Sequence, residues 1–273
     1  MIDQVARQTF EEKGYHIIPG LLSNDEAKAY RFAINRAFDL PERELTNTDI
    51  ESRTYALADG VTRRPEFWPL IFNQRLVETI RELLGDDIRY TQHSDLHINL
   101  GAGKWHRDSA YREFGVGPDW NEAQAPYRVV RVAVYLSHYE DSGSSLLVLP
   151  GTHRRENRLN KLELRFWSEV RTRWRAHFNT NSLPQFSLTM KSETIRHQPG
   201  DCVVFDQRLV HAGGIVRGER PKYAIYLSYG LDNIHAHNHH DYYLSRPTYL
   251  PELPEDLTMQ LDAANLRLAP HPA

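Results

Sequence analysis

128-RVVRVAVYLSHY-139 is one of five short stretches, rich in β-branched and aromatic residues, that follow one another in this 273-residue chain. Such stretches are typical of β-strands. Clusters of Gly, Pro, Asp and Ser separate them, which favours an antiparallel sandwich or barrel over alternating strands and helices. The other four stretches are 88–100, 145–153, 193–206 and 222–230.

The part of the chain before these strands is predicted to be mainly helical. Residues 9–38 predict a short helix, a strand around 15–18 and a longer helix that Ser23 or Asn24 can cap. Residues 67–85 predict another helix, because leucine and isoleucine recur there every four residues and a glycine follows. Helices therefore come first and strands follow.

One further helix is expected to interrupt the strands, at about residues 154–178. Apolar residues recur there at steps of three and four, and basic residues fill the positions between them. Such a basic face is either simply solvated or belongs to a lid whose arginines meet an anionic substrate. Arg171 and Arg173 are the candidates for that second role.

We therefore expect a single domain over residues 1–273. It is divided into a helical support at 1–87, a core at 88–232 that contains the helical insertion, and a wrapping segment at 233–273. The Pro-rich stretch 246–255 and the tail 269–273 are typical of wrapping or loosely ordered segments.

Composition excludes several classes of protein. The chain is 40% hydrophobic and 25% charged, and 33 basic against 36 acidic residues leave a formal charge of −3, so nothing suggests a nucleic-acid partner. The single cysteine, Cys202, lies in an apolar run and is expected to be a buried, inert thiol. No stretch has the length and apolarity of a membrane span or signal sequence, so a cytoplasmic protein is expected. The sequence does not indicate an oligomeric state.

The stretch 103-GKWHRDSAYR-112 carries the first candidate for chemistry. His106 and Asp108 are two residues apart, so in extended chain their side chains point to the same side and can share a metal ion. An isolated pair of this kind also occurs in ordinary surface loops. A third ligand is needed to support a metal site.

The stretch 200-GDCVVFDQRLVHAGG-214 offers that ligand. His211 follows a predicted buried strand and stands just before two glycines. Two histidines and one carboxylate suit non-haem Fe(II) and leave coordination positions open for a chelating co-substrate and dioxygen. A chelating 2-oxo acid also needs a cation for its distant carboxylate, and Arg217, Arg220 and Lys222 follow His211.

Together these segments resemble the phytanoyl-CoA dioxygenase-like branch of the Fe(II)/2-oxoglutarate-dependent oxygenases. Each segment is a weak signal alone, but their order and spacing are specific. They are 13-KGYHIIPGLLSNDEA-27, 81-RELLGDDIR-89, 105-WHRDS-109, 134-VYLSHYEDSGSSLLVLPGTHR-154 and 200-GDCVVFDQRLVHAGG-214.

The resemblance implies a mainly β fold with flanking helices, built on a double-stranded β-helix, that is, a jelly-roll, cupin-like core. It also implies that His106, Asp108 and His211 bind iron, with 2-oxoglutarate and O2 as co-substrates. Halogenating relatives lack the carboxylate that this chain keeps at Asp108. Hydroxylation or a related oxidation of an unactivated C–H bond is therefore implied, with release of succinate and CO2.

The residue that binds 2-oxoglutarate is less clear from the pattern. Relatives usually place an arginine about eleven residues after the second histidine, and that position holds Lys222, with Arg220 two residues earlier. Residue type favours Arg220, and Lys222 is the alternative. Gln92 is a further candidate at the cofactor site. The expected substrate is a small metabolite, with an anionic group as one option. Its candidate contacts are His97, Trp105, Tyr111, Arg112, Arg171 and Arg173.

The cluster 235-HAHNHHDYY-243 is a rival metal site, because it places His235, His237, His239 and His240 within six residues. No capping or strand signal accompanies it, so we expect an exposed segment near the mouth of the active site or at an interface. A metal-binding cupin-like protein without oxygenase turnover is the main alternative function. A serine hydrolase is disfavoured, since the chain has no G-x-S-x-G motif.

Overall fold

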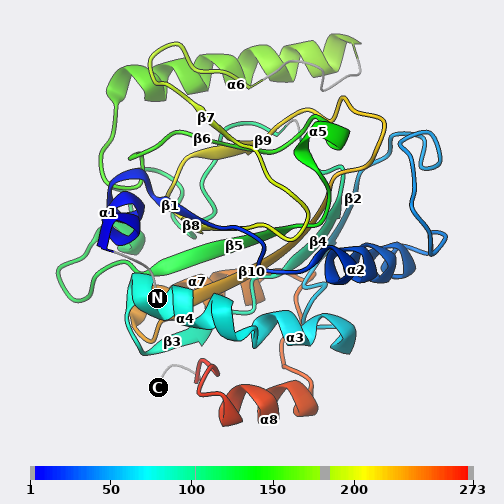
Figure 1. The fold of residues 1–273 in the computed structure, drawn as a ribbon. Coiled ribbons are helices and arrows are strands. Elements are labelled where there is room, and N and C mark those ends of the chain that lie inside the picture. The colour runs from blue at the N-terminus through cyan, green and yellow to red at the C-terminus, as the bar shows by residue number, and fades with distance from the viewer. Residues whose placement is uncertain (1–3, 102, 179–184, 270–273) are drawn as a thin grey trace.

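Strand β5 (Val129–Tyr135) lies inside the larger of two antiparallel sheets, and all seven of its residues are buried. The computed structural model describes residues 4–101, 103–178 and 185–269 (Figure 1). Within them, the larger sheet runs in the order β1 (Tyr15–Ile18), β8 (Cys202–Asp206), β5, β10 (Tyr223–Leu231), β4 (Asp95–Ile98) and β2 (Tyr55–Ala58), and β3 (Ile88–Tyr90) also pairs with β10. The smaller sheet consists of β7 (Glu193–Ile195), β6 (Leu146–Val148) and β9 (His211–Gly213).

Both faces of the larger sheet are covered, which explains the unbroken apolar run in β5. Ala133 and Tyr135 pack in one apolar cluster with Leu146 of the smaller sheet. Val132 and Val134, which point the opposite way, belong to the cluster that includes the helices. A strand buried on both faces loses the polar residues that would otherwise alternate with its apolar ones.

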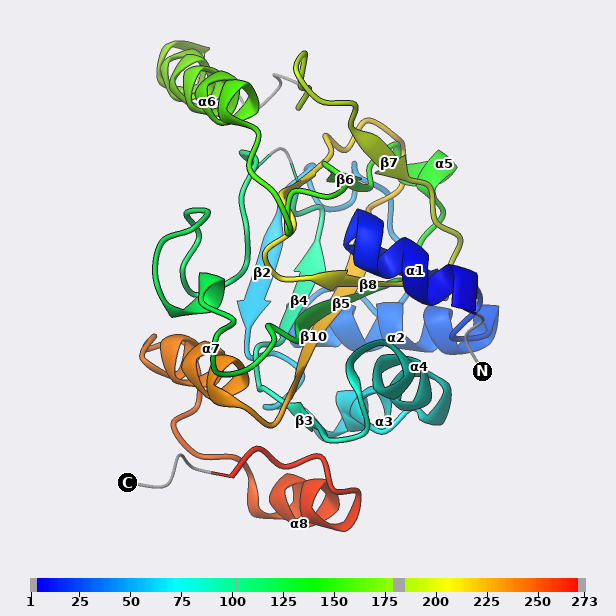
Figure 2. The ribbon, with the colours of Figure 1, turned by 90° about the vertical axis from the view of Figure 1, so that its left-hand side faces the viewer.

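The outer face of the larger sheet is covered by helices α2 (Asn24–Ala37), α3 (Trp68–Ile71) and α4 (Gln74–Leu84) (Figure 2). Ser23, one of the two predicted caps, caps α2 in a reciprocal capping box with Glu26. The single helix expected at 67–85 is instead divided, because the Asn73 side chain accepts the Leu76 N–H and starts a new helix. The 3₁₀ turn η1 (Pro65–Phe67) precedes α3, and α1 (Gln4–Lys13) lies beside β1.

The N-terminal part of the chain is not only helical. Strands β1 and β2 precede residue 88 and form the two ends of the sheet's main path. The stretch 88–100 forms two strands rather than one, because residues 91–94 are irregular and Gln92 has a φ of 58°. Strands β2 and β9 are short and were not predicted.

Helix α6 (Arg158–Phe178) is the helix expected between the strands, and it stands above the smaller sheet (Figures 1 and 2). Part of its apolar surface is not covered: Leu159, Leu162 and Phe166 are 68%, 65% and 57% exposed. Two smaller elements are α5 (Tyr139–Ser142) and the 3₁₀ turn η2 (Pro118–Trp120).

The C-terminal segment is more regular than its sequence suggests. It forms α7 (Ile234–Leu244) and α8 (Glu255–Ala263), and Leu257 and Leu261 of α8 join the main apolar cluster. Residues 270–273 of the tail lie outside the described residues. Cys202 is a buried free thiol, as predicted. No helix in the described part of the chain combines the length and apolarity that a membrane crossing needs.

Candidate metal centre

His106, Asp108 and His211 meet in a cavity of about 400 Å³ that residues of both sheets line. One nitrogen of each imidazole and one carboxylate oxygen all lie within 4.8 Å of one another. Asp108 Oδ1 lies 3.5 Å from His106 Nε2, and Asp108 Oδ2 lies 3.4 Å from His211 Nε2. His211, which is distant in sequence, thus meets the neighbouring pair His106 and Asp108 at one point.

The backbone fixes this convergence. His106 and His211 exchange both N–H to O hydrogen bonds, each 2.9 Å, in an isolated antiparallel bridge. The backbone N–H groups of Asp108 and Ser109 both donate to the Gln207 carbonyl, each at 2.9 Å. The H-x-D segment is therefore held against the loop that leads from β8 to β9. In this extended segment His106 and Asp108 point to the same side, as their spacing predicts.

The two imidazoles are oriented as metal ligands would be. His106 Nδ1 lies 2.9 Å from the Lys104 carbonyl oxygen, and His211 Nδ1 lies 3.0 Å from that of Leu209. A carbonyl only accepts hydrogen bonds, so each Nδ1 carries a proton, and Nε2, which faces Asp108, is the nitrogen that a metal ion would bind. This donor set of two neutral imidazoles and one carboxylate fits a divalent metal such as Fe(II).

The titration of the site agrees with this donor set. Burial and the nearby His211 lower the pKa of His106 to about 4, so this imidazole is neutral at neutral pH. Burial alone would raise the pKa of Asp108, but the two facing imidazoles and Arg131 hold it well below its usual range. The site therefore offers an ionised carboxylate beside an unprotonated histidine, as a metal ion requires.

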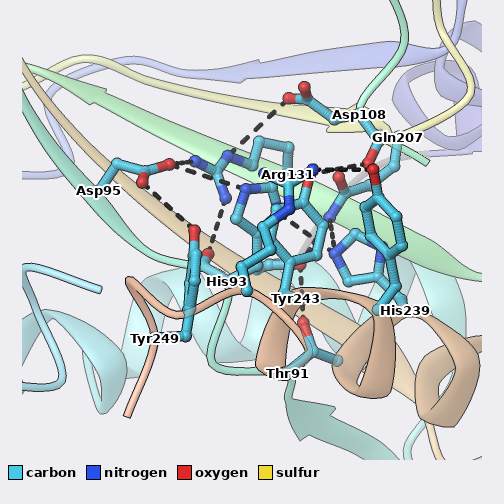
Figure 3. A network of polar contacts seen from close by, with 12 residues as sticks. Thr91, His93, Asp95, Asp108, Arg131, Gln207, His239, Tyr243 and Tyr249 are labelled. Atoms are coloured by element: carbon cyan, nitrogen blue, oxygen red, sulfur yellow. Dashed lines mark hydrogen bonds and ion pairs between the residues drawn. The ribbon is translucent and has the colours of Figure 1, made fainter. Parts of the chain in front are cut away.

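Arg131, on β5, lies behind the carboxylate (Figure 3). It is 3% exposed, forms an ion pair with Asp95, donates to the His93 carbonyl oxygen at 2.7 Å and places its Nε 4.0 Å from Asp108 Oδ2. Tyr243 of α7 donates its hydroxyl to the Asp108 backbone carbonyl at 3.1 Å. Asp108 is thus held from two sides, by charge and by a hydrogen bond.

Lys222 and Arg220 occupy different places. Lys222 is 2% exposed, lines the triad cavity and donates from Nζ to the Leu100 carbonyl oxygen at 2.6 Å. Arg220 is 54% exposed, lines a separate hollow and lies 3.8 Å from Glu44 Oε2. The two side chains therefore line different hollows, because residues 218–220 form a bend and β10 begins only at Tyr223.

Residues 10–224 match the family model of phytanoyl-CoA dioxygenase (PhyH), which covers most of the chain. The chain belongs to this family. An ectoine dioxygenase from Streptomyces avermitilis is 26% identical over 157 residues, which are 54% of this chain and 50% of the relative. The match therefore spans about half the length of the curated relatives.

Solved structures show the same fold. HygX from Streptomyces hygroscopicus, with nickel and 2-oxoglutarate bound, has a TM-score of 0.59 and 18% identity, over 84% of this chain and 87% of that one. SnoK, a non-haem α-ketoglutarate-dependent carbocyclase from nogalamycin biosynthesis, has a TM-score of 0.58 and 17% identity, over 85% of each chain. These likenesses, with the two antiparallel sheets described above, confirm the predicted jelly-roll core.

The structure brings two of the other predicted contacts of this PhyH-family chain to the cavity and leaves others outside it. His97 lines the cavity, with its ring centroid 4.8 Å from that of Tyr226, and Arg112 lines it as well. Gln92 does not; its amide donates to the Leu250 carbonyl at 2.9 Å and to Asp59 at 3.3 Å, which ties down the C-terminal segment.

The remaining predicted contacts lie elsewhere. Trp105 donates to the Phe186 carbonyl oxygen at 3.2 Å and lines the groove beside α6 rather than the triad cavity. Tyr111 is 43% exposed and lines neither. Arg171 and Arg173 of α6 also line neither, because the helix stands above the smaller sheet and these residues lie in its later turns.

The histidine cluster is not an exposed segment, which corrects that expectation. It forms α7, capped by Asn233, and three of its four imidazoles are buried. His239 Nε2 lies 3.1 Å from His93 Nδ1, and the two residues take part in the network behind Asp108 (Figure 3). The missing helix signal is explained by burial, since α7 is fixed by packing on β5 and β10 rather than by an amphipathic pattern.

Sequence reasoning missed several residues of the cavity. Arg131 gave a signal, because a lone charge within the apolar run of β5 must be paired once it is buried. Asp95, on β4, gave none. Tyr243, Arg246 and Tyr249 gave none either, since tertiary contacts of the C-terminal segment bring them to the cavity.

Proposed function

We propose that this chain is an Fe(II)- and 2-oxoglutarate-dependent dioxygenase. It hydroxylates, or otherwise oxidises, an unactivated C–H bond of a small anionic metabolite. The observation that carries the proposal is the convergence of His106, Asp108 and His211, with both Nε2 atoms facing the carboxylate, in a cavity that also contains a buried lysine. Membership of the phytanoyl-CoA dioxygenase family supports it.

In this proposal His106, Asp108 and His211 hold the iron. When bound, Fe(II) with 2-oxoglutarate and O2 would supply the oxidation, and 2-oxoglutarate would leave as succinate and CO2. The protein's part is to orient the ligands, to keep Asp108 ionised and to enclose the substrate. Because the protein would supply only three ligands, the other coordination positions of the iron would stay open to the co-substrates.

Lys222 is the proposed partner of the distant carboxylate of 2-oxoglutarate. Its ammonium has three N–H donors, and the Leu100 carbonyl is the one hydrogen-bond acceptor described for it. No carboxylate of the described residues lies within 4.0 Å of it. Because a buried charge is costly unless it is paired, a bound carboxylate would supply the missing counter-charge.

The proposed substrate is a small metabolite with an anionic group. The cavity is lined by Arg112 and Arg246 in addition to the triad and Lys222. Arg246 stacks over the rings of Tyr242 and Tyr243, 4.7 and 4.5 Å from their centroids, and donates to the Tyr242 hydroxyl at 2.8 Å. These contacts orient a guanidinium that keeps its full charge for a ligand.

A metal-binding cupin-like protein without turnover is the second candidate function. One measurement distinguishes the two candidate functions. It is the consumption of 2-oxoglutarate by the purified chain with Fe(II) and O2 but no other substrate. An oxygenase consumes 2-oxoglutarate slowly under these conditions. A chain that binds iron and 2-oxoglutarate but never consumes it is a binding protein.

Arg131→Met is expected to weaken iron binding by about 10- to 100-fold, because Asp108 loses the charge that holds it. The substitution also leaves Asp95 buried and unpaired, so the free energy of unfolding should fall by roughly 3–5 kcal/mol. Iron affinity is measured by titration against a competing chelator, and stability by denaturant unfolding.

The double variant Arg131→Met/Asp95→Leu separates these two effects. It removes both charges, so it should recover stability without recovering iron affinity. If iron affinity returned together with stability, Arg131 would support the fold only and would have no part in positioning Asp108.

A further inference from the structure

A second hollow lies beside the triad cavity, between α6 and the segment that contains His106. Its volume is about 340 Å³. Residues 104–107 and 112–114 form one wall, and residues of 152–168 form the other. His106 and Arg112 line both this groove and the triad cavity, so the two hollows adjoin at an iron ligand of the proposed site.

The groove is strongly basic in a chain whose overall charge is negative. Two carboxylates line it, Glu113 and Glu156, and Lys161 pairs with both, at 2.9 and 3.1 Å. The groove's cationic side chains are Lys104, Arg107, Arg112, Arg155, Lys161 and Arg165. The lining therefore carries six cations against two carboxylates, an excess of four positive charges, and a hollow between two walls concentrates their field.

Arg107 gives the most specific indication. Its guanidinium donates to three backbone carbonyl oxygens, those of Arg208 at 2.8 Å and of Arg112 and Thr152 at 3.3 Å. Within the described residues no carboxylate oxygen lies within 4.0 Å of it. A fixed, partly buried cation with neutral partners favours an anionic ligand.

We propose that this groove binds an anionic group of the substrate while the carbon to be oxidised lies beside His106 in the triad cavity. The inference rests on the proposed function and extends it. Guanidinium groups bind carboxylate, phosphate and sulfonate oxygens through paired N–H donors, so the ligand class is an oxyanion. The substrate is then elongated, with its acidic end under α6.

Helix α6 supplies a matched control. Arg165 lines the groove, with a side chain that is 82% exposed and an Nε 3.9 Å from Glu169 Oε1. Arg173, two turns further along the same helix, is exposed as well but does not line the groove. If the positive charge of α6 alone attracted anions, they would bind at both arginines. If the groove forms the binding site, they bind at Arg165 and not at Arg173.

Arginine footprinting with phenylglyoxal tests the groove, with inorganic sulfate as the probe and chloride at equal ionic strength as the reference. At sulfate near twice its dissociation constant, modification of Arg155 and Arg165 should slow about threefold, while that of Arg173 stays unchanged. Arg165→Glu should abolish the protection of Arg155, and Arg173→Glu should leave it intact. Equal protection of Arg173, or no protection in the groove, would overturn the inference.

A kinetic experiment then links the groove to the substrate. With the first acid-bearing substrate found by stimulated 2-oxoglutarate consumption, Arg165→Glu should raise KM about tenfold and leave kcat unchanged. Arg173→Glu should keep the wild-type KM. A footprint without this KM effect would mean that the groove binds a free anion rather than the substrate. Unlike the proposed function, the footprint needs no iron or turnover, so the failure of one is distinguishable from the failure of the other.

Discussion

Asp108→Ala should reduce iron-dependent 2-oxoglutarate consumption by about a thousandfold or more, which is roughly 4 kcal/mol of lost transition-state stabilisation. Asp108 lies 3.5 and 3.4 Å from the Nε2 atoms of the two triad histidines and is the only carboxylate in that set of described residues. Without it the site keeps two neutral imidazoles and no anionic ligand. The measurement is the rate of succinate formation with Fe(II) in excess.

His240→Ala is the matched control for the rival metal site. His240 belongs to the histidine cluster on α7, and its Nδ1 faces Asp241 at 3.5 Å rather than the triad. We expect wild-type consumption of 2-oxoglutarate in this variant. Activity that survives Asp108→Ala but is lost in His240→Ala would transfer the metal centre to α7.

Lys222→Met should raise the dissociation constant of 2-oxoglutarate about 100-fold, since a buried, charge-assisted contact is lost. The fold should keep its stability, because methionine replaces a buried cation that has no counter-charge among the described residues. Lys222→Arg should retain most of the affinity. Arg220→Met, on the separate outer hollow, should change it less than about twofold. The reverse ranking of Lys222→Met and Arg220→Met would restore the assignment made from residue type.

The same site predicts a pH dependence. Burial lowers the pKa of Lys222 to about 8, and the amine is cationic below its pKa and neutral above it. The dissociation constant of 2-oxoglutarate should therefore rise above pH 8, by up to about tenfold per pH unit. Lys222→Arg removes this rise, because a guanidinium stays charged. A flat profile in the wild-type chain would mean that the distant carboxylate binds elsewhere.

The part of the site that could be predicted from sequence is the part encoded locally. His106 and Asp108 share one extended segment, so their spacing puts both side chains on the same side. His211 lies much later in the chain and is brought beside them by the backbone bridge between His106 and His211. The sequence does not show that Arg220 and Lys222 line different hollows, because this depends on the bend at residues 218–220 before β10 begins at Tyr223. Residue type carries no information on that point.

In the fold, too, the locally encoded elements could be predicted and those that depend on tertiary contacts could not. Strongly patterned elements such as α2 and β5 lie where the sequence predicts them. The four-residue strand β2 and the three-residue strand β9 are too short for a periodic signal, and they exist because neighbouring strands complete their hydrogen bonds. The apolar stripe of α6 predicts a helix correctly but says nothing of its packing, and the stripe is exposed.

The most direct test of the central claim is anaerobic reconstitution with Fe(II), followed by 2-oxoglutarate and a visible absorption spectrum. Chelation of ferrous iron by a 2-oxo acid gives a weak metal-to-ligand charge-transfer band. The account predicts this band in the wild-type chain and its loss in His106→Ala. Iron that stays bound in the wild-type chain without any band on addition of 2-oxoglutarate would contradict the account.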